Sequence, residues 1–335
     1  MLAGRSYKFA EFVLWTRRPL YALIAFNAAV VVLYQVVGLK WLTIPWGVAF
    51  MLGTTVALMA GFKSTQTYNR TWEAQQIWAS IAGMSRLWGT VSRDFLSDGK
   101  ESQRLIYRHL AWLTALRYQM RDSKAWETAK KASNAEYLKN YGVPEKERAL
   151  EVEIAKYVSP EEKSRILIAN GKATQVLGLQ SEALKATLDS GVIPANVFFE
   201  LQKILKEFQD LQAKSERIKN YPYPRQYAVI NAIFVRILCF LLPLGIISEL
   251  ERLNQLVEGV MAGHMVWLAI PLGVLISWMY AALDQVGESS ANPFEGGAND
   301  VPISQICNSI EIDLRQLLGE SGVPLSSSPS RPIVM

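Results

Sequence analysis

The chain has 335 residues, half of them hydrophobic, and a formal net charge of +5. Its mean hydropathy is only slightly positive, which is typical of a few membrane spans attached to a large soluble part rather than of a soluble enzyme. Two cysteines exclude a disulfide framework and two histidines exclude a histidine-rich metal centre, so we predict no metal and no cofactor.

The N-terminal part of the chain predicts a membrane hairpin. Residues 1–18 are basic and amphipathic, and the apolar run 20–37 that follows Pro19 is long enough to span a bilayer. It is too long for the apolar region of a cleavable signal peptide, so we expect it to remain in the protein as the first membrane span. A short turn at 38–40 leads to a second apolar run, 41–62, which we expect to return antiparallel to the first.

Residues 63–226 contain no apolar run long enough to span a membrane, and they read as helices. Leucines recur at helical spacing from Leu105 to Leu116, and Ser159-Pro160-Glu161-Glu162 is typical of a helix start. Basic and acidic residues are interleaved here, which argues against a nucleic-acid partner. We have no functional interpretation of the insert 125–190, which reads as a longer helical hairpin.

Two further apolar runs, 227–248 and 265–283, predict the third and fourth spans. Most of the 35 basic residues lie in 63–226, and four precede the first span, so the positive-inside rule places the middle segment and both termini in the cytosol. We therefore predict an all-α protein divided into 1–62 (the amphipathic segment and spans one and two), 63–226 (a cytosolic helical domain), 227–283 (spans three and four) and 284–335 (a cytosolic helix and a flexible tail).

Catalytic motifs are absent from the sequence. It contains no phosphate-binding glycine loop, no Gly-x-Ser-x-Gly and no zinc-protease helix. We therefore predict that the protein is not an enzyme.

One stripe of the second span permits two interpretations. Thr54, Leu58 and Phe62 are spaced four apart and so share one helix face. The simpler interpretation is that this stripe packs on a neighbouring helix. The other is that copies of the stripe from several subunits surround a pore and gate it by dewetting, which requires a ring because four spans enclose a pore with difficulty.

Three motifs resemble the bestrophin family of ion channels. The first is Arg70-Thr71-Trp72-Glu73 with Trp78 and Arg86 downstream. The second is Glu216-Arg217-Ile218-Lys219 with Pro222, Pro224 and the later Leu242-Pro243-Leu244-Gly245. The third is Asn292-Pro293-Phe294 with Asn299, Asp300 and Pro302. They occur in order around the four spans, and the resemblance covers most of the chain except the insert 125–190.

The resemblance implies a homopentamer in which five copies of the helix 41–62 form a hydrophobic neck. The family's neck positions fall on Thr54, Leu58 and Phe62, where threonine departs from a usually apolar set, and a second, cytosolic constriction falls near Phe199. We expect Arg70, Trp72 and Glu73 to pack the cytosolic helices against the membrane helices.

The third motif lacks the acidic run that holds calcium in animal bestrophins. Calcium prefers six to eight oxygen ligands, so we expect no calcium switch here. Instead we expect Asn299 and Asp300 to serve as a helix N-cap or in a turn.

Together with this resemblance, the sequence predicts a homopentameric channel of the cell inner membrane whose partners are its own copies, the lipid bilayer and permeant monovalent ions. Anions such as chloride are favoured, because a basic vestibule concentrates them. A sodium-selective channel, a transporter with a substrate site among the spans and a non-conducting membrane scaffold remain alternatives.

Overall fold

The computed structural model describes residues 8–96, 98–129, 131–138, 141–324, 333 and 335. Within them every secondary-structure element is a helix, which confirms the predicted fold class. The helices, in chain order, are α1 (Phe9–Gln35), α2 (Trp46–Phe95), α3 (Gly99–Arg121), α4 (Ala132–Leu138), α5 (Pro144–Glu147), α6 (Leu150–Ile154), α7 (Pro160–Ile168), α8 (Lys172–Asp189), α9 (Ala195–Asn220), α10 (Arg225–Asn254), the 3₁₀ helix η1 (Met265–Leu268), α11 (Ala269–Ser289) and α12 (Ile303–Leu317).

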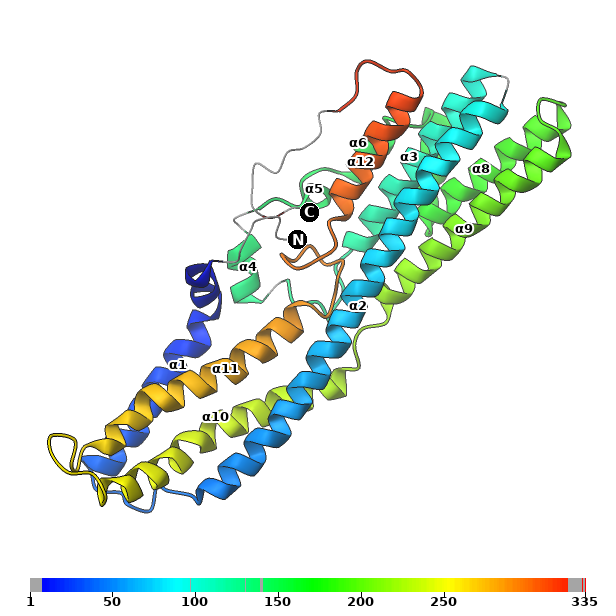
Figure 1. Cartoon of the computed structure of the whole chain (residues 1–335). Coiled ribbons are helices and arrows are strands. Elements are labelled where there is room, and N and C mark those ends of the chain that lie inside the picture. The colour runs from blue at the N-terminus through cyan, green and yellow to red at the C-terminus, as the bar shows by residue number, and fades with distance from the viewer. Residues whose placement is uncertain (1–7, 97, 130, 139–140, 325–332, 334) are drawn as a thin grey trace.

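The molecule is elongated and has two parts (Figure 1). We name α1, α10, α11 and the first part of α2 the membrane bundle, and the rest of α2 with α3–α9 and α12 the helical domain. Four segments are long and apolar enough to cross a membrane: Phe9–Gln35, part of Trp46–Phe95, Arg225–Asn254 and Met265–Ser289. The four predicted spans are therefore confirmed.

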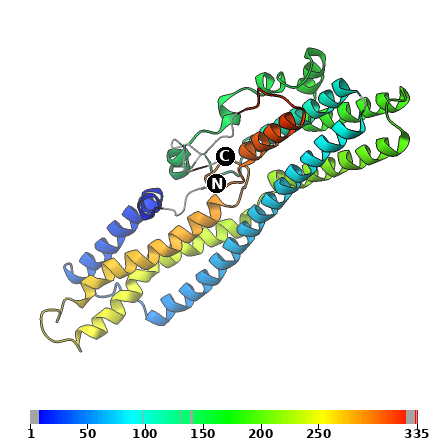
Figure 2. The ribbon, with the colours of Figure 1, turned by 45° about the horizontal axis from the view of Figure 1, so that its top comes forward.

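Helix α2 runs through both parts without a break, as both views show (Figures 1 and 2). Its 50 residues correspond to a length of about 75 Å, whereas a bilayer's hydrocarbon core is about 30 Å thick. The helix begins at Trp46 rather than at residue 41, because Pro45 has no N–H to donate and disfavours the helical conformation at Ile44. More than half of α2 must therefore lie outside the bilayer.

Other helix ends also differ from the limits of the apolar runs. Helix α1 begins at Phe9 and continues through Pro19, so the amphipathic residues and the first span form one helix. Helix α9 ends at Asn220, because Pro222 and Pro224 cannot continue its hydrogen bonding. The predicted helix start at Ser159 is confirmed, since the Ser159 side chain accepts a hydrogen bond from the Glu162 amide and caps α7.

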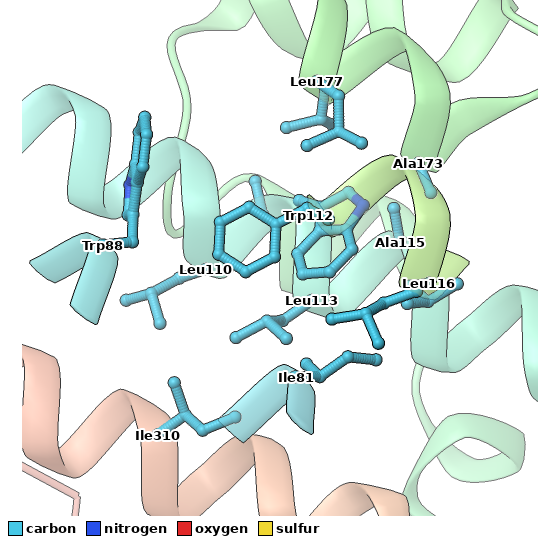
Figure 3. Close-up of a cluster of buried hydrophobic side chains, with 14 of the residues drawn as sticks. Ile81, Trp88, Leu110, Trp112, Leu113, Ala115, Leu116, Ala173, Leu177 and Ile310 are labelled. Carbon is cyan, nitrogen blue, oxygen red and sulfur yellow. The ribbon is translucent and has the colours of Figure 1, made fainter. Parts of the chain in front are cut away.

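The core of the helical domain is built from large side chains of α2, α3, α8, α9 and α12 (Figure 3). Trp112 is fully buried and its indole N–H donates to the side-chain amide oxygen of Gln212 at 2.9 Å, which satisfies its one polar atom. Trp88 meets Phe208 edge to face with ring centroids 6.1 Å apart. Burying each such side chain stabilises the domain by about 2–3 kcal/mol, so this end of α2 is fixed by packing.

The insert 125–190 is not a simple hairpin, because it contains the short helices α4 to α7 followed by α8. Helix α4 lies against the start of α1, where the Trp15 indole donates to Asn134 at 3.0 Å and Arg17 pairs with Glu136 at 2.9 Å. The insert thus joins the helical domain to the membrane bundle. The predicted flexible tail lies largely outside the described residues.

Candidate pore surface and the junction beneath it

The stripe of Thr54, Leu58 and Phe62 is exposed on the surface of the single chain. Leu58 is 64% and Phe62 63% exposed, whereas Val56 and Ala60 on the other side of α2 are buried against the bundle. Thr54 turns its hydroxyl back to the Met51 carbonyl at 2.9 Å. The stripe is therefore not covered by another described helix of the same chain. Packing against a neighbouring helix within one chain does not explain it.

Below the apolar stripe the same side of α2 becomes polar. Every exposed residue of α2 from Thr54 to Trp72 is uncharged, and the polar ones below Phe62 include Thr65 and Asn69. Further along, the Glu73 side chain is 42% exposed and pairs with Arg217. Hydroxyl and amide groups are poorly suited to face lipid. This surface can therefore interact with hydrated ions.

Just beneath Phe62, a buried ion pair holds three membrane helices together. The Lys63 ammonium of α2 lies 2.5 Å from the Asp284 carboxylate of α11, which also accepts a hydrogen bond from Asn231 of α10 at 2.6 Å. None of the residues predicted from the sequence belongs to this cluster. The available signal was that Lys63 and Asp284 are the first charges after the second and fourth apolar runs, which end on the same side of the membrane.

Arg70 connects the three sequence motifs at the junction between the membrane bundle and the helical domain. Its guanidinium donates to the Ile218 carbonyl at 2.9 Å and to the Ala291 carbonyl at 3.1 Å. Next to it, the Thr71 hydroxyl donates to the Ser290 carbonyl at 3.0 Å. Residues more than 140 positions apart in the sequence are thereby fixed relative to α2.

The neighbouring motif residues also make contacts around this junction. Glu73 pairs with Arg217 of α9, and the half-exposed Trp72 ring stacks with Tyr68 at a centroid distance of 6.4 Å. Pro222 lies in the break after α9, and Pro224 occupies the N-cap position of α10. These residues connect elements, and two of the predicted site residues, Arg70 and Pro224, line a cavity of about 610 Å³ together with Phe62.

The loop after α11 is buried beneath this junction. Pro293 and Phe294 are buried, and the Phe294 ring lies 6.2 Å from the ring of Trp78. The Asn292 amide donates to Glu295 at 3.4 Å, and the exposed Asn299 donates to Ser289 at 3.4 Å. Asp300 accepts from the Gly296 amide at 2.7 Å and closes the turn, while Pro302 occupies the N-cap position of α12.

Glu295 is a buried carboxylate of this loop that is not among the residues predicted from the sequence. Its two carboxylate oxygens accept hydrogen bonds from the amide and the hydroxyl of Thr128, each at 2.7 Å. Burial, with a smaller contribution from the nearby charge of Asp300, raises the pKa of Glu295 to about 7. Thr128 lies in the insert, 167 positions away, and no local pattern in the sequence predicts this pairing.

Phe199 lies in the first turns of α9, at the end of the helical domain far from the membrane bundle. Its side chain is exposed and contacts Phe198 edge to face, with centroids 5.6 Å apart. The structure of the single chain thus leaves Phe199, like the α2 stripe, available to neighbours or solvent. Among the described residues, no group of three acidic, histidine or cysteine side chains could hold a metal ion.

Comparisons with known proteins identify the fold and the family. The family described as "Bacterial/Fungal Bestrophin protein" matches residues 13–316. The Voltage-dependent anion channel-forming protein YneE of Escherichia coli K12 is 26% identical over 298 residues, which cover 89% of this chain and 84% of the relative. A voltage-dependent anion channel-forming protein of Mesorhizobium japonicum is 23% identical over 271 residues, 81% of this chain and 74% of the relative.

A solved structure supports the same fold. The crystal structure of a bacterial bestrophin homologue from Klebsiella pneumoniae superposes with a TM-score of 0.74 at 19% identity, covering 90% of this chain and 97% of that chain. The resemblance inferred from the three motifs is confirmed, and so is the prediction that the protein is an ion channel and not an enzyme. The family match spans nearly the whole chain, and the chain therefore belongs to the bacterial and fungal bestrophin family of transmembrane ion channels.

Proposed function

We propose that five copies of this chain form a ring that conducts monovalent ions passively, with anions such as chloride favoured, through a neck lined by Thr54, Leu58 and Phe62. The exposed side of α2 carries this proposal, because it is apolar at the neck and polar below it. One helix provides only one wall of a pore, so the proposal requires a ring of copies.

The neck would set gating more than selectivity. An apolar constriction opposes ion passage by dewetting, and no exposed charge on α2 between Thr54 and Trp72 favours one sign of ion. Lys63, directly below Phe62, is neutralised by Asp284 and faces away from the stripe. Thr54 makes the upper ring wetter than an all-apolar neck would be.

The preference for anions rests on two supports. Several relatives are named voltage-dependent anion channel-forming proteins. The basic excess of residues 63–226 also favours anions near the ring. The same basic excess, with the basic N-terminal segment, supports a location in the inner membrane with both termini in the cytosol.

The test is the reversal potential of the purified protein in planar bilayers under a KCl gradient. We expect a potential close to the chloride equilibrium potential. A potential close to that of potassium, repeated with sodium, would instead support a cation-selective channel. An intact ring without current under any applied voltage would contradict conduction and favour a membrane scaffold.

A further inference from the structure

A polar cavity of about 320 Å³ lies in the helical domain, between α3, α12 and the segment that carries α5 and α6. None of its lining residues belongs to α2. In both views α12 and α9 lie on opposite sides of α2 (Figures 1 and 2). The cavity is therefore separate from the candidate pore surface, and the inference drawn from it does not depend on ion conduction.

Cations outnumber carboxylates in the lining of this cavity. Its four cationic side chains are Arg117, Arg148, Lys156 and Arg315, whereas its two carboxylates are Glu153 and Glu311. A concave surface of one sign raises the local concentration of ions of the opposite sign. Glu320, outside the lining, also pairs with Arg315 at 2.7 Å, so the cations left to attract an anion are Arg117, Arg148 and Lys156.

Both carboxylates are already engaged by the protein. The two oxygens of Glu153 each accept from the Lys156 ammonium at 2.8 Å, and Arg148 lies 3.6 Å away. Glu311 accepts from the Tyr157 hydroxyl at 2.8 Å and from Arg315 at 3.3 Å. Neither carboxylate is therefore free to attract a cationic ligand.

Several donors, in contrast, are not used. Within the described part of the chain Arg117 makes no hydrogen bond, and its contacts with Glu145 at 3.4 Å and Glu153 at 3.7 Å are loose ion pairs. Its Nε atom is buried and has no partner. The half-buried Asn308 side chain on α12 likewise has no hydrogen-bond partner among the described residues. The guanidinium of Arg117 and the amide of Asn308 are therefore only weakly used within the protein and are available to an acceptor in the cavity.

We propose that this cavity binds a small phosphorylated anion, with its phosphate held by Arg117, Arg148 and the Asn308 amide. Guanidinium groups match the oxygen spacing of phosphate, and a half-exposed lysine such as Lys156 adds charge without fixed geometry. Leu110, Leu113 and Pro144 provide apolar surface for the remainder of the ligand. The cavity volume lies within the range of small-ligand sites.

The test is calorimetric titration of the detergent-solubilised full chain with inorganic phosphate and, separately, with glycerol phosphate. We expect saturable binding that persists at physiological chloride concentration. Tighter binding of glycerol phosphate would identify a phosphate ester as the ligand class, and equal affinities would identify free phosphate.

Two substitutions locate the site. Arg148→Gln and Asn308→Leu should each weaken binding roughly tenfold, the effect of losing one charge-assisted or otherwise unsatisfied hydrogen bond. Among the described residues neither side chain makes a hydrogen bond, so both variants should unfold at the temperature of the parent. The matched control is Arg165→Gln, which removes an exposed arginine paired with Glu182 outside the cavity. Absence of saturable binding, or equal affinity in all three variants, would overturn the proposal.

Discussion

Leu58 and Leu275 are chemically identical and occupy different surfaces of the membrane bundle. Leu58 is 64% exposed on the α2 stripe, and Leu275 is 52% exposed on α11. If the stripe lines a pore, truncating Leu58 widens and wets the neck, whereas truncating Leu275 removes only a contact with lipid or a neighbouring helix.

We therefore predict that Leu58→Ala raises single-channel conductance or open probability and that Leu275→Ala leaves both unchanged. Planar-bilayer recordings of the two variants and the parent protein measure this difference directly, and Phe62→Ala should behave like Leu58→Ala. Equal currents from all of these proteins would show that the α2 stripe does not control conduction.

The pair of Lys63 and Asp284 permits a second prediction at the same scale. Lys63 is almost fully buried, and its aliphatic chain packs on Gly287. Replacing Lys63 by Met leaves the carboxylate of Asp284 without its cation, which costs about 3–5 kcal/mol when one partner of a buried ion pair is lost. Adding Asp284→Asn removes that uncompensated charge and keeps a partner for Asn231.

The expected result is strong coupling between the two substitutions. The free energy of unfolding of the double variant should exceed that of the Lys63→Met variant, although the double variant has lost two native groups. Thermal unfolding of the four proteins of this cycle in one detergent gives the coupling energy. Additive losses would show that the two groups do not interact in the folded protein.

His109 is a buried residue whose protonation opposes folding. Because the Ser85 hydroxyl already donates to the Ile81 carbonyl at 2.6 Å, the Nε2 atom of His109 carries the proton in its 2.8 Å contact with Ser85. Its Nδ1 atom is buried without a partner, and burial lowers the pKa of His109 to about 3. The unfolded chain takes up a proton near pH 6.5, so stability falls as the pH falls below that value.

We predict that His109 alone costs about 2 kcal/mol of stability at pH 5 relative to pH 7.5. His109→Phe keeps an aromatic ring beside Trp112 and Phe208 and should remove this loss. Unfolding curves of the parent and the variant between pH 5 and pH 7.5 provide the comparison. A variant with the pH dependence of the parent would show that the imidazole titrates normally in the fold.

At the scale of elements, the loop after α11 contains a carboxyl group, Glu295, whose titration changes stability with pH in the direction opposite to that of His109. The pKa of Glu295 is raised to about 7 in the folded state. Between pH 4.5 and pH 7 the folded chain therefore holds a proton on Glu295 that the unfolded chain has lost. The stability that this proton contributes is lost as the pH rises through that window. Glu295→Gln imitates the protonated side chain and can keep both contacts with Thr128 if the hydroxyl reverses its role.

Glu295→Gln should therefore be more stable than the parent above pH 7 and equal to it near pH 5. The sign is opposite to that of His109, so each effect must be measured as a difference between variant and parent at the same pH. Hydrogen exchange of the Thr128 amide, which donates to Glu295, reports the local change. Faster exchange in the variant at pH 8 would contradict the prediction.

The same elements show how far the sequence predicts this structure. Four apolar runs predict four spans because lipid requires about 20 consecutive apolar residues. Hydropathy does not reveal that α2 continues for more than 30 residues beyond Phe62, since a helix that passes from lipid to water changes composition without changing backbone geometry. The contact between Thr128 and Glu295 is set by tertiary packing, and neither residue's neighbours in the sequence indicate it.

The candidate pore surface likewise combines features that the sequence predicts with features that only the folded chain shows. Spacing alone places Thr54, Leu58 and Phe62 on one face of α2, because helical periodicity is local. It does not determine whether that face is covered by the same chain, and the exposure of Leu58 and Phe62 in the folded chain was needed for that. The sequence identifies Arg70 as a motif residue, but only the fold shows that it donates to the carbonyls of Ile218 and Ala291 on two separate segments.

At the scale of the whole molecule, a contiguous apolar surface outside the membrane bundle indicates an interface with protein. A cavity of about 500 Å³ between α2 and α9 is lined by Leu87, Val91 and Phe95. Leu87 and Phe95 are exposed at the end of α2 that lipid cannot reach. Contiguous exposed apolar surface of this kind marks an interface between proteins, and a second copy of this chain fits the proposed ring.

We predict that the detergent-solubilised protein has five times the 37.6 kDa mass of one chain by native mass spectrometry. Leu87→Asp introduces a charge at the expected interface, where its desolvation is costly, and should yield smaller species. Ile168→Asp is the matched control, because Ile168 is 86% exposed at the end of α7 in the insert, away from α2 and α9. A parent protein with the mass of one chain would remove the ring, and with it the neck, because one copy of α2 cannot enclose a pore.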